Sequence, residues 1–218
     1  MNLLTRGSKH ALQHRLIWQS SSLLLAYPDE QHTGRLGTVD QLLAHITGPA
    51  ADLLARSAAA LRATDATRAA EDYVETFDLR RRSTMYLTYW TAGDTRNRGS
   101  EMHSFAEVYR DAGVEPPGAE APDYLPVVLE FAATVDPDAG RRLLIEHRVP
   151  IDVLREALTE VDSPYACVIS AVCETLPAAT GREVQRVRQL TQAGPPAESV
   201  GLQPFTLTVP PRRVEGVG

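Results

Sequence analysis

Two carboxylates, Asp123 and Glu130, stand seven positions apart and would share one face of a helix. Two helical turns separate such residues by about 10 Å, which is long for an acid–base pair that acts on a single bond. The distance suits a clamp for a cation-bearing ligand. A structural interpretation is equally open, in which Asp123 caps the helix at the amide of Leu125 and Glu130 forms a buried salt bridge.

Two histidines, His10 and His14, lie one helical turn apart and could hold a metal ion between them. A complete metal site would need further ligands from Cys, Asp or Glu, and none stands near these histidines in the sequence. A solvated start of a helix is the simpler interpretation. A metal-binding protein that uses Asp123, Glu130, His10 and His14 remains the alternative function.

Recognisable catalytic patterns are missing from the sequence. It contains neither G-x-x-x-x-G-K-[ST] nor G-x-G-x-x-G after a strand, and no nucleophile stands with a plausible base. We therefore expect a protein that is not an enzyme and holds no cofactor or metal stably. The two cysteines, Cys167 and Cys173, are six positions apart in one predicted helix. That is too far for an intrahelical disulfide and suits a reducing compartment.

The charge distribution argues against nucleic acid as a partner, because the net charge is −6 with both signs interspersed. The run Arg80–Arg82 could contact DNA if the protein were a helical regulator. Acidic residues precede this run within one or two turns, so local pairing is the simpler interpretation. These acidic residues are Glu71, Asp72, Glu75 and Asp78.

Three of the acidic residues, Glu71, Glu75 and Asp78, fall on one helical face because they are spaced by four and three positions. They lie beside an apolar stripe that contains Tyr73 and Phe77. An ordinary solvated face has the same pattern. An acidic rim around an apolar groove would also fit a basic amphipathic helix of another protein.

Apolar residues recur at helical spacing through most of the chain. The expected helices cover residues 12–27, 38–46, 50–63, 65–77, 95–112, 123–131, 137–147, 150–161, 163–176 and 182–192. Gly34 and Gly37 mark a turn before the second of these helices, and Asp65 caps the fourth. The segment 123–131 is apolar on nearly every face, which predicts a central helix surrounded by others.

The segment between Leu79 and Gly99 is ambiguous, because Met85–Trp90 mixes aromatic and β-branched residues. No second strand candidate accompanies it, so we interpret it as a buried helix or a tightly packed connection. The expected fold class is therefore all-α, with a single-domain helical bundle over residues 1–193.

A Pro- and Gly-rich C-terminal tail, residues 194–218, follows this domain, and we expect it to be disordered or loosely docked. Its apolar residues Phe205, Leu207 and Val209 have no partner in the pattern. No apolar run approaches the roughly 20 residues of a membrane span, and the N-terminal one is too short for a signal peptide. We expect a cytoplasmic protein without direct membrane insertion.

Two long blocks of sequence carry a resemblance to a known family. The first runs from Tyr73 to Arg82 and continues through Tyr86–Tyr89 to Gly93–Gly99, and the second runs from Asp123 to Ala132. Together with Leu24–Asp29, they resemble the nitrate reductase molybdenum-cofactor assembly chaperones. These are the NarJ-like members of the TorD/DmsD/NarJ superfamily of redox enzyme maturation chaperones. The likeness covers roughly residues 13–176.

The resemblance implies an all-helical chaperone that is not catalytic. Its client would be the apo catalytic (alpha) subunit of a respiratory nitrate reductase, whose N-terminal segment it would bind. The client would stay competent for insertion of the molybdenum bis-guanine dinucleotide cofactor before membrane assembly. The cofactor-insertion machinery would be a further partner.

The resemblance also points to residues that would contact the client peptide. They are Tyr73, Glu75, Phe77, Leu79, Tyr86, Tyr89, Asp123, Tyr124, Leu125, Pro126 and Glu130. One position departs from the family pattern, because Tyr124 stands where histidine is usual. Client release that is tuned by an imidazole is therefore not expected from this position.

Overall fold

The structure is a computed structural model that describes residues 3–92, 96–116 and 118–194. Within these ranges the chain is helical, and its extended backbone pairs only in an isolated antiparallel bridge between Tyr86 and Tyr124. The α-helices are α1 (Leu3–Leu25), α2 (His32–Leu43), α3 (Pro49–Arg62), α4 (Ala66–Tyr73), α5 (Tyr89–Ala92), α6 (Arg96–Asp111), α7 (Leu125–Thr134), α8 (Pro137–Glu146), α9 (Arg148–Glu160), α10 (Tyr165–Cys173) and α11 (Gly181–Ala193). The predicted all-α class is confirmed. The predicted tail, residues 194–218, lies outside the described residues except for Gly194.

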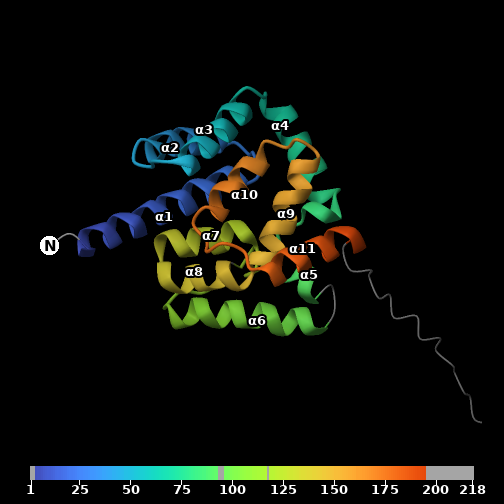
Figure 1. The fold of residues 1–218 in the computed structure, drawn as a ribbon. Helices are drawn as coiled ribbons and strands as arrows, with labels where there is room; N and C mark the ends of the chain where they lie inside the picture. Colours follow the sequence, from blue (N-terminus) through green and yellow to red (C-terminus); the bar gives the residue numbers. More distant parts are fainter. Residues whose placement is uncertain (1–2, 93–95, 117, 195–218) are drawn as a thin grey trace, which may run out of the picture.

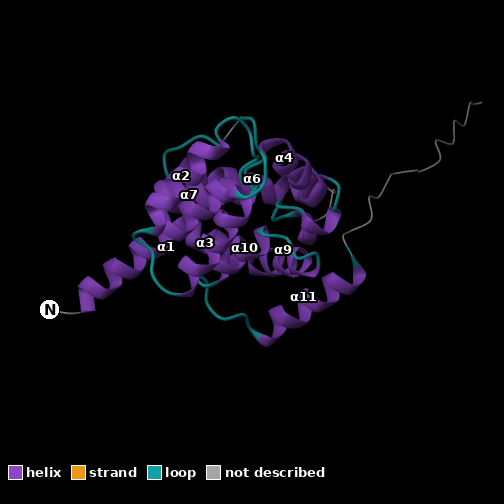
Figure 2. Cartoon of the chain, turned by 90° about the horizontal axis from the view of Figure 1, so that it is seen from above, coloured by secondary structure: helices purple, strands orange, loops and turns teal. Residues whose placement is uncertain are grey.

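Helix α7 is the centre of the bundle, as its largely apolar sequence predicts. Seven of its ten residues are buried, and it packs between α1 and α8. Figure 1 shows α6 below α8, with α2 and α3 on the opposite side of α1. Figure 2, which views the molecule from above, shows α9 and α11 side by side, in agreement with the direct packing of α11 on α9.

Several helix ends follow from local chemistry. The carboxylate of Asp65 accepts a hydrogen bond from the Arg68 amide at 3.1 Å, so its predicted role as an N-cap is confirmed. Helix α3 begins where Gly48 has a φ of 82° and Pro49 takes the first helical position. Thr180 opens α11 with a capping box.

The turn predicted at Gly34 and Gly37 is wrong, because both glycines lie inside α2. Glycine lowers helix propensity by about 1 kcal/mol per residue, a cost that packing can override. The buried side chains of Leu36 and Val39 hold this helix on the core. Tertiary contact therefore extends α2 to His32.

Helix α4 continues into a π-helical turn, η1 (Val74–Asp78). The ambiguous segment that follows from Leu79 is a tightly packed connection, one of the two predicted alternatives, and it contains the 3-10 turn η2 (Arg81–Ser83) and the short helix α5. The bridge lies between η2 and α5, where the Leu87 amide donates to the Asp123 carbonyl at 3.1 Å and the Leu125 amide donates to the Met85 carbonyl at 2.9 Å. Tyr124, which pairs with Tyr86 in this bridge, lies in the extended backbone directly before α7. None of the described helices is long and apolar enough to cross a membrane.

Candidate functional site

An aromatic cluster lies where α4 and η1 meet α10. The Tyr73 ring lies 4.8 Å from that of Phe77 and 5.3 Å from that of Tyr27, and Phe77 lies 4.9 Å from Tyr165, measured between ring centroids. Tyr73 is 4% exposed and Phe77 is 7% exposed. Both predicted contact residues are therefore part of the core, and their rings do not face solvent.

An open groove runs along the outer face of α4 and η1 beside this cluster. We call it the acidic-rimmed groove; it is a shallow, open depression of about 760 Å³ and is lined by Tyr27, Thr67, Ala70, Glu71, Val74, Glu75 and Leu79. Leu79 is 73% exposed and Tyr27 is 47% exposed, so two large apolar side chains meet solvent at the same surface. Apolar side chains that are exposed next to each other can form a site of protein contact. Two predicted residues, Glu75 and Leu79, thus lie at one accessible surface.

Sequence reasoning missed Tyr27, Ala70 and Val74 in this groove. The signal was present, because Thr67, Ala70 and Val74 recur at helical spacing on the face next to that of Tyr73 and Phe77. The groove also lies over the π-helical turn, and π-helical turns are frequent at functional sites.

The acidic residues of the rim carry surface ion pairs. Glu75 lies 2.7 Å from Arg80, and Glu71 lies 3.6 Å from Arg68. All four side chains are between 41% and 62% exposed. Exposed pairs of this kind contribute at most about 1 kcal/mol, so an incoming cation can replace either arginine at little cost.

Three predicted tyrosines are half-buried next to the bridge. The rings of Tyr86 and Tyr124 lie 5.3 Å apart, and the Arg98 guanidinium lies 5.2 Å from the Tyr86 ring centroid. The Tyr89 hydroxyl accepts a hydrogen bond from Arg81 at 3.0 Å. Burial raises the pKa of Tyr124 to about 12. This hydroxyl therefore stays protonated at physiological pH, unlike the histidine usual at this position.

Asp123 does not cap α7, so the predicted bond to the Leu125 amide is wrong. The fully buried carboxylate instead accepts from the backbone amide of Thr88 at 3.1 Å and from its hydroxyl at 2.6 Å. Tyr124 is the N-cap and makes no side-chain cap bond. Asp123 therefore positions the connection before α5. Leu125 and Pro126 are buried with it, and the Pro126 carbonyl accepts from Ser22 at 2.9 Å.

Glu130 is exposed on α7, so the predicted buried salt bridge is wrong. It lines a second groove between α6 and α7, together with Tyr109, Val114, Glu115, Val127, Phe131, Thr134 and Val135. Because Asp123 is sealed in the core and Glu130 faces solvent, the two carboxylates do not form a clamp.

The histidine pair is also separate from the groove. The rings of His10 and His14 lie 4.4 Å apart in an edge-on arrangement. Among the residues that the structure describes, no three His, Cys, Asp or Glu side chains gather as a metal site would require.

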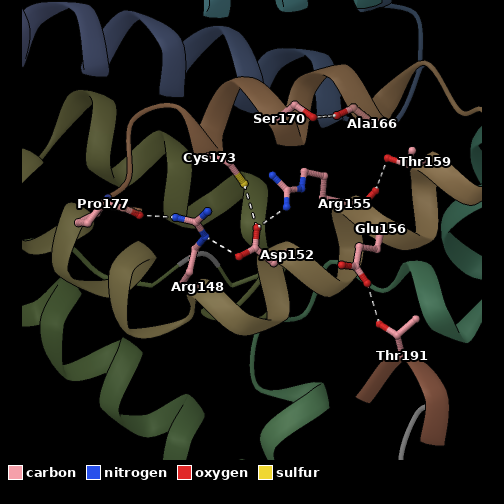
Figure 3. A network of polar contacts seen from close by, with 10 residues as sticks. All are labelled: Arg148, Asp152, Arg155, Glu156, Thr159, Ala166, Ser170, Cys173, Pro177 and Thr191. Atoms are coloured by element: carbon pink, nitrogen blue, oxygen red, sulfur yellow. Dashed lines mark hydrogen bonds and ion pairs between the residues drawn. The ribbon is translucent and has the colours of Figure 1, made fainter. Parts of the chain in front are cut away.

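A buried polar network joins α9 to α10 (Figure 3). Asp152 accepts from Arg148 at 2.6 Å and lies 3.2 Å from Arg155, and the Cys173 thiol donates to it over 3.5 Å. Arg148 also donates to the Pro177 carbonyl at 2.6 Å. Burial raises the pKa of the Cys173 thiol to about 12. The network stabilises the packing of the two helices and does not reach the groove.

The amino-acid sequence is similar to those of a known protein family and of several of its members. Residues 40–170 match the family model described as "Nitrate reductase delta subunit". The chain is 30% identical over 163 residues to the "Probable nitrate reductase molybdenum cofactor assembly chaperone NarJ" of Bacillus subtilis, covering 74% of this chain and 89% of that protein. It is 26% identical over 103 residues to the "Probable nitrate reductase molybdenum cofactor assembly chaperone NarW" of Escherichia coli, covering 47% of this chain and 45% of that protein.

A further relative is much longer than this chain. The chain is 61% identical over 160 residues to the "Nitrate reductase-like protein NarX" of Mycobacterium tuberculosis, covering 73% of this chain. The match spans only 24% of that relative's length. The similarity to the Mycobacterium protein is therefore limited to one region of it.

Proposed function

The chain belongs to the nitrate reductase delta subunit family, and we propose that it is an assembly chaperone for a respiratory nitrate reductase. It binds the N-terminal segment of the apo catalytic (alpha) subunit and keeps that subunit competent for molybdenum cofactor insertion before membrane assembly. The observation that carries the proposal is the similarity to the Bacillus subtilis chaperone, which extends over 89% of that protein.

The acidic-rimmed groove supports the proposal because it has the chemistry of a peptide site. Its apolar side chains, Val74 and Leu79, offer anchors for apolar residues of a client segment. Glu71 and Glu75 stand beside them and favour a segment that also carries Lys or Arg. An amphipathic helix or an extended segment with these features would bury the exposed Leu79 side chain.

The proposed role needs binding without catalysis. The protein holds no cofactor of its own, and the molybdenum bis-guanine dinucleotide enters the client. It acts in the cytoplasm, with the cofactor-insertion machinery as a further partner. An affinity in the micromolar range, about 8 kcal/mol, would retain a client and still allow release.

Calorimetric titration of the purified chain with a synthetic peptide of the client's N-terminal segment tests the proposal. We expect saturable micromolar binding. Leu79→Asp should weaken it at least about tenfold, since a carboxylate replaces an apolar anchor at an acidic rim. Val184→Asp is the matched control, because Val184 is also exposed but lies on α11. The absence of heat at high micromolar peptide, with a folded protein, would refute the chaperone role.

A charge reversal at the rim separates electrostatics from apolar contact. Glu75→Lys should weaken binding of a basic client peptide and leave the melting temperature nearly unchanged, because the Glu75–Arg80 pair is exposed. Glu146→Lys, at an exposed position on α8, provides the same change of net charge away from the groove. Equal weakening by both variants would show that only the net charge of the protein matters.

A further inference from the structure

The acidic-rimmed groove leaves two large apolar side chains, Leu79 and Tyr27, without cover in the described part of the chain. A soluble protein that exposes such a surface without its partner risks non-specific association. A ligand within the same chain would remove this risk. The question is whether the sequence contains a segment of matching chemistry.

Residues 205–213 have the composition that the groove requires. These residues lie outside the described ranges, so only their sequence bears on the argument. Phe205, Leu207 and Val209 alternate with threonines, so an extended segment would present all three on one side. Arg212 and Arg213 follow after two prolines, which favour extended backbone. The segment therefore has three apolar side chains on one side, followed by two positively charged side chains.

The groove and the segment are also similar in length. The groove-lining positions from Thr67 to Leu79 are 12 residues apart in helical backbone, which spans about 18 Å. The distance from Phe205 to Arg212 in an extended chain is about 23 Å. The three apolar side chains can therefore lie along the groove while the arginines reach its rim.

The end of α11 lies close to the groove. The Thr191 carbonyl accepts a hydrogen bond from Arg82, which is in η2, three residues after Leu79. From Gly194 to Phe205 the chain has 11 residues, which extend to about 36 Å. The connection is thus long enough to place residues 205–213 across α4 and η1 without disturbing α11.

Charge favours this placement. Within the described residues, Glu71 and Glu75 pair with exposed arginines, Arg68 and Arg80. The arginines at 212 and 213 can replace them without stranding a buried charge, since all four partners remain in contact with solvent. The second groove, between α6 and α7, has no comparable link to the end of α11 among the described contacts.

We propose that residues 205–213 bind in the acidic-rimmed groove of their own chain as an internal competitor. A tethered ligand has an effective concentration of about 1 mM, so even a weak intrinsic interaction occupies the groove. A client segment then enters only by displacing it. The inference goes beyond the proposed function, although it concerns the same groove, and its test needs no client; the two can fail separately.

Photo-crosslinking in the full chain tests the inference. A benzoylphenylalanine is introduced at position 205, and cross-linked peptides are mapped by mass spectrometry. We expect cross-links from position 205 to peptides that contain Tyr27, Val74 or Leu79. The same probe at position 184, exposed on α11, is the control and should not reach these peptides. A mixture of isotopically labelled and unlabelled protein distinguishes contacts within one copy from contacts between copies.

Exchanging the charges of the segment and the rim provides a second test of the inference. Arg212→Glu with Arg213→Glu should reduce the cross-link yield up to about fivefold, as expected from rim pairs of at most about 1 kcal/mol. Adding Glu71→Lys and Glu75→Lys should restore it. The inference is overturned if position 205 cross-links to the second groove, to another copy or to nothing, or if the swap does not restore the yield in variants whose circular dichroism matches the parent chain.

Discussion

The hydroxyl groups of Tyr73 and Tyr124 lie 3.0 Å apart, and the Tyr73 hydroxyl also lies 3.0 Å from the Leu25 carbonyl. Because a hydroxyl has one proton and Leu25 offers only an acceptor, Tyr73 donates to Leu25 and Tyr124 donates to Tyr73. This chain of bonds connects the end of α1, α4 and the start of α7. Two of the motif tyrosines therefore join the two blocks of sequence that carry the family resemblance.

Removing the Tyr124 hydroxyl should cost less stability than removing that of Tyr73. Tyr124→Phe deletes the terminal donor, and we expect a loss of about 1 kcal/mol in the free energy of unfolding. Tyr73→Phe deletes a donor and an acceptor at a buried position, so we expect a loss of about 2 kcal/mol. Urea unfolding measures both. Equal losses in the free energy of unfolding would contradict the assigned chain of hydrogen bonds from Tyr124 through Tyr73 to Leu25.

Asp123 should prove to be a structural residue. Asp123→Ala leaves the buried amide and hydroxyl of Thr88 without their acceptor, and we expect a loss of about 2–3 kcal/mol. A double-mutant cycle with Thr88→Val should show coupling between the two side chains. Asp111→Ala, at an exposed position near the end of α6, is the control. A wild-type unfolding midpoint for Asp123→Ala would contradict this role.

Gly140 should tolerate no side chain, since a Cβ placed there would lie 2.3 Å from the Cβ of Ala132. Helices α7 and α8 therefore approach each other through this glycine. Gly140→Ala should destabilise the protein by about 3 kcal/mol because the helices must separate. Gly34→Ala is the matched control: nothing lies within 4 Å of its added Cβ, and it should stabilise α2 by up to about 1 kcal/mol. Thermal unfolding of both variants checks the prediction.

Protonation of His14 should destabilise the fold. Burial, with smaller contributions from His10 and Arg141, lowers its pKa from 6.5 to about 4. Between these values the unfolded chain binds the proton and the folded chain does not. The stability contributed by neutral His14 is therefore complete above pH 6.5 and is lost as pH falls toward 4. Partial exposure reduces its size.

The His14 prediction is checked by melting temperatures at pH 7 and pH 5. The decrease between these values should be smaller in His14→Gln than in the parent chain. A decrease in His14→Gln as large as that of the parent would contradict the assignment.

The two cysteines should differ in reactivity. Burial and the neighbouring Asp152 raise the pKa of Cys173 to about 12, so its thiolate is scarce at pH 8. Cys167 is partly exposed. We expect iodoacetamide to modify Cys167 first and Cys173 only after unfolding, as followed by mass spectrometry of the native protein. Equal labelling rates would indicate that the α9–α10 network opens.

Local chemistry explains the parts of the fold that the sequence predicts. Helical periodicity located most helices, and Asp65 caps α4 because a side-chain oxygen and a free amide lie three residues apart. The largely apolar 125–134 segment marks α7 as central, since a helix that is apolar on nearly every face must be surrounded by others. These features depend on neighbours in the sequence.

Long-range packing decided what the sequence could not. The spacing of Tyr73, Phe77, Glu75 and Leu79 shows that the segment is amphipathic, but which face is covered depends on α10 and Tyr165, about ninety residues away. The tertiary structure buries Tyr73 and Phe77 and exposes Leu79.

In the same way, Asp123 lies just before α7, where aspartate often caps a helix, yet the Leu125 amide bonds to Met85 and the Asp123 carboxylate bonds to Thr88. The sequence by itself determined most of the helices, the family and the apolar and acidic residues available for a site. Only the tertiary structure decided which of them face solvent, because burial depends on contacts between segments that the order of residues does not specify.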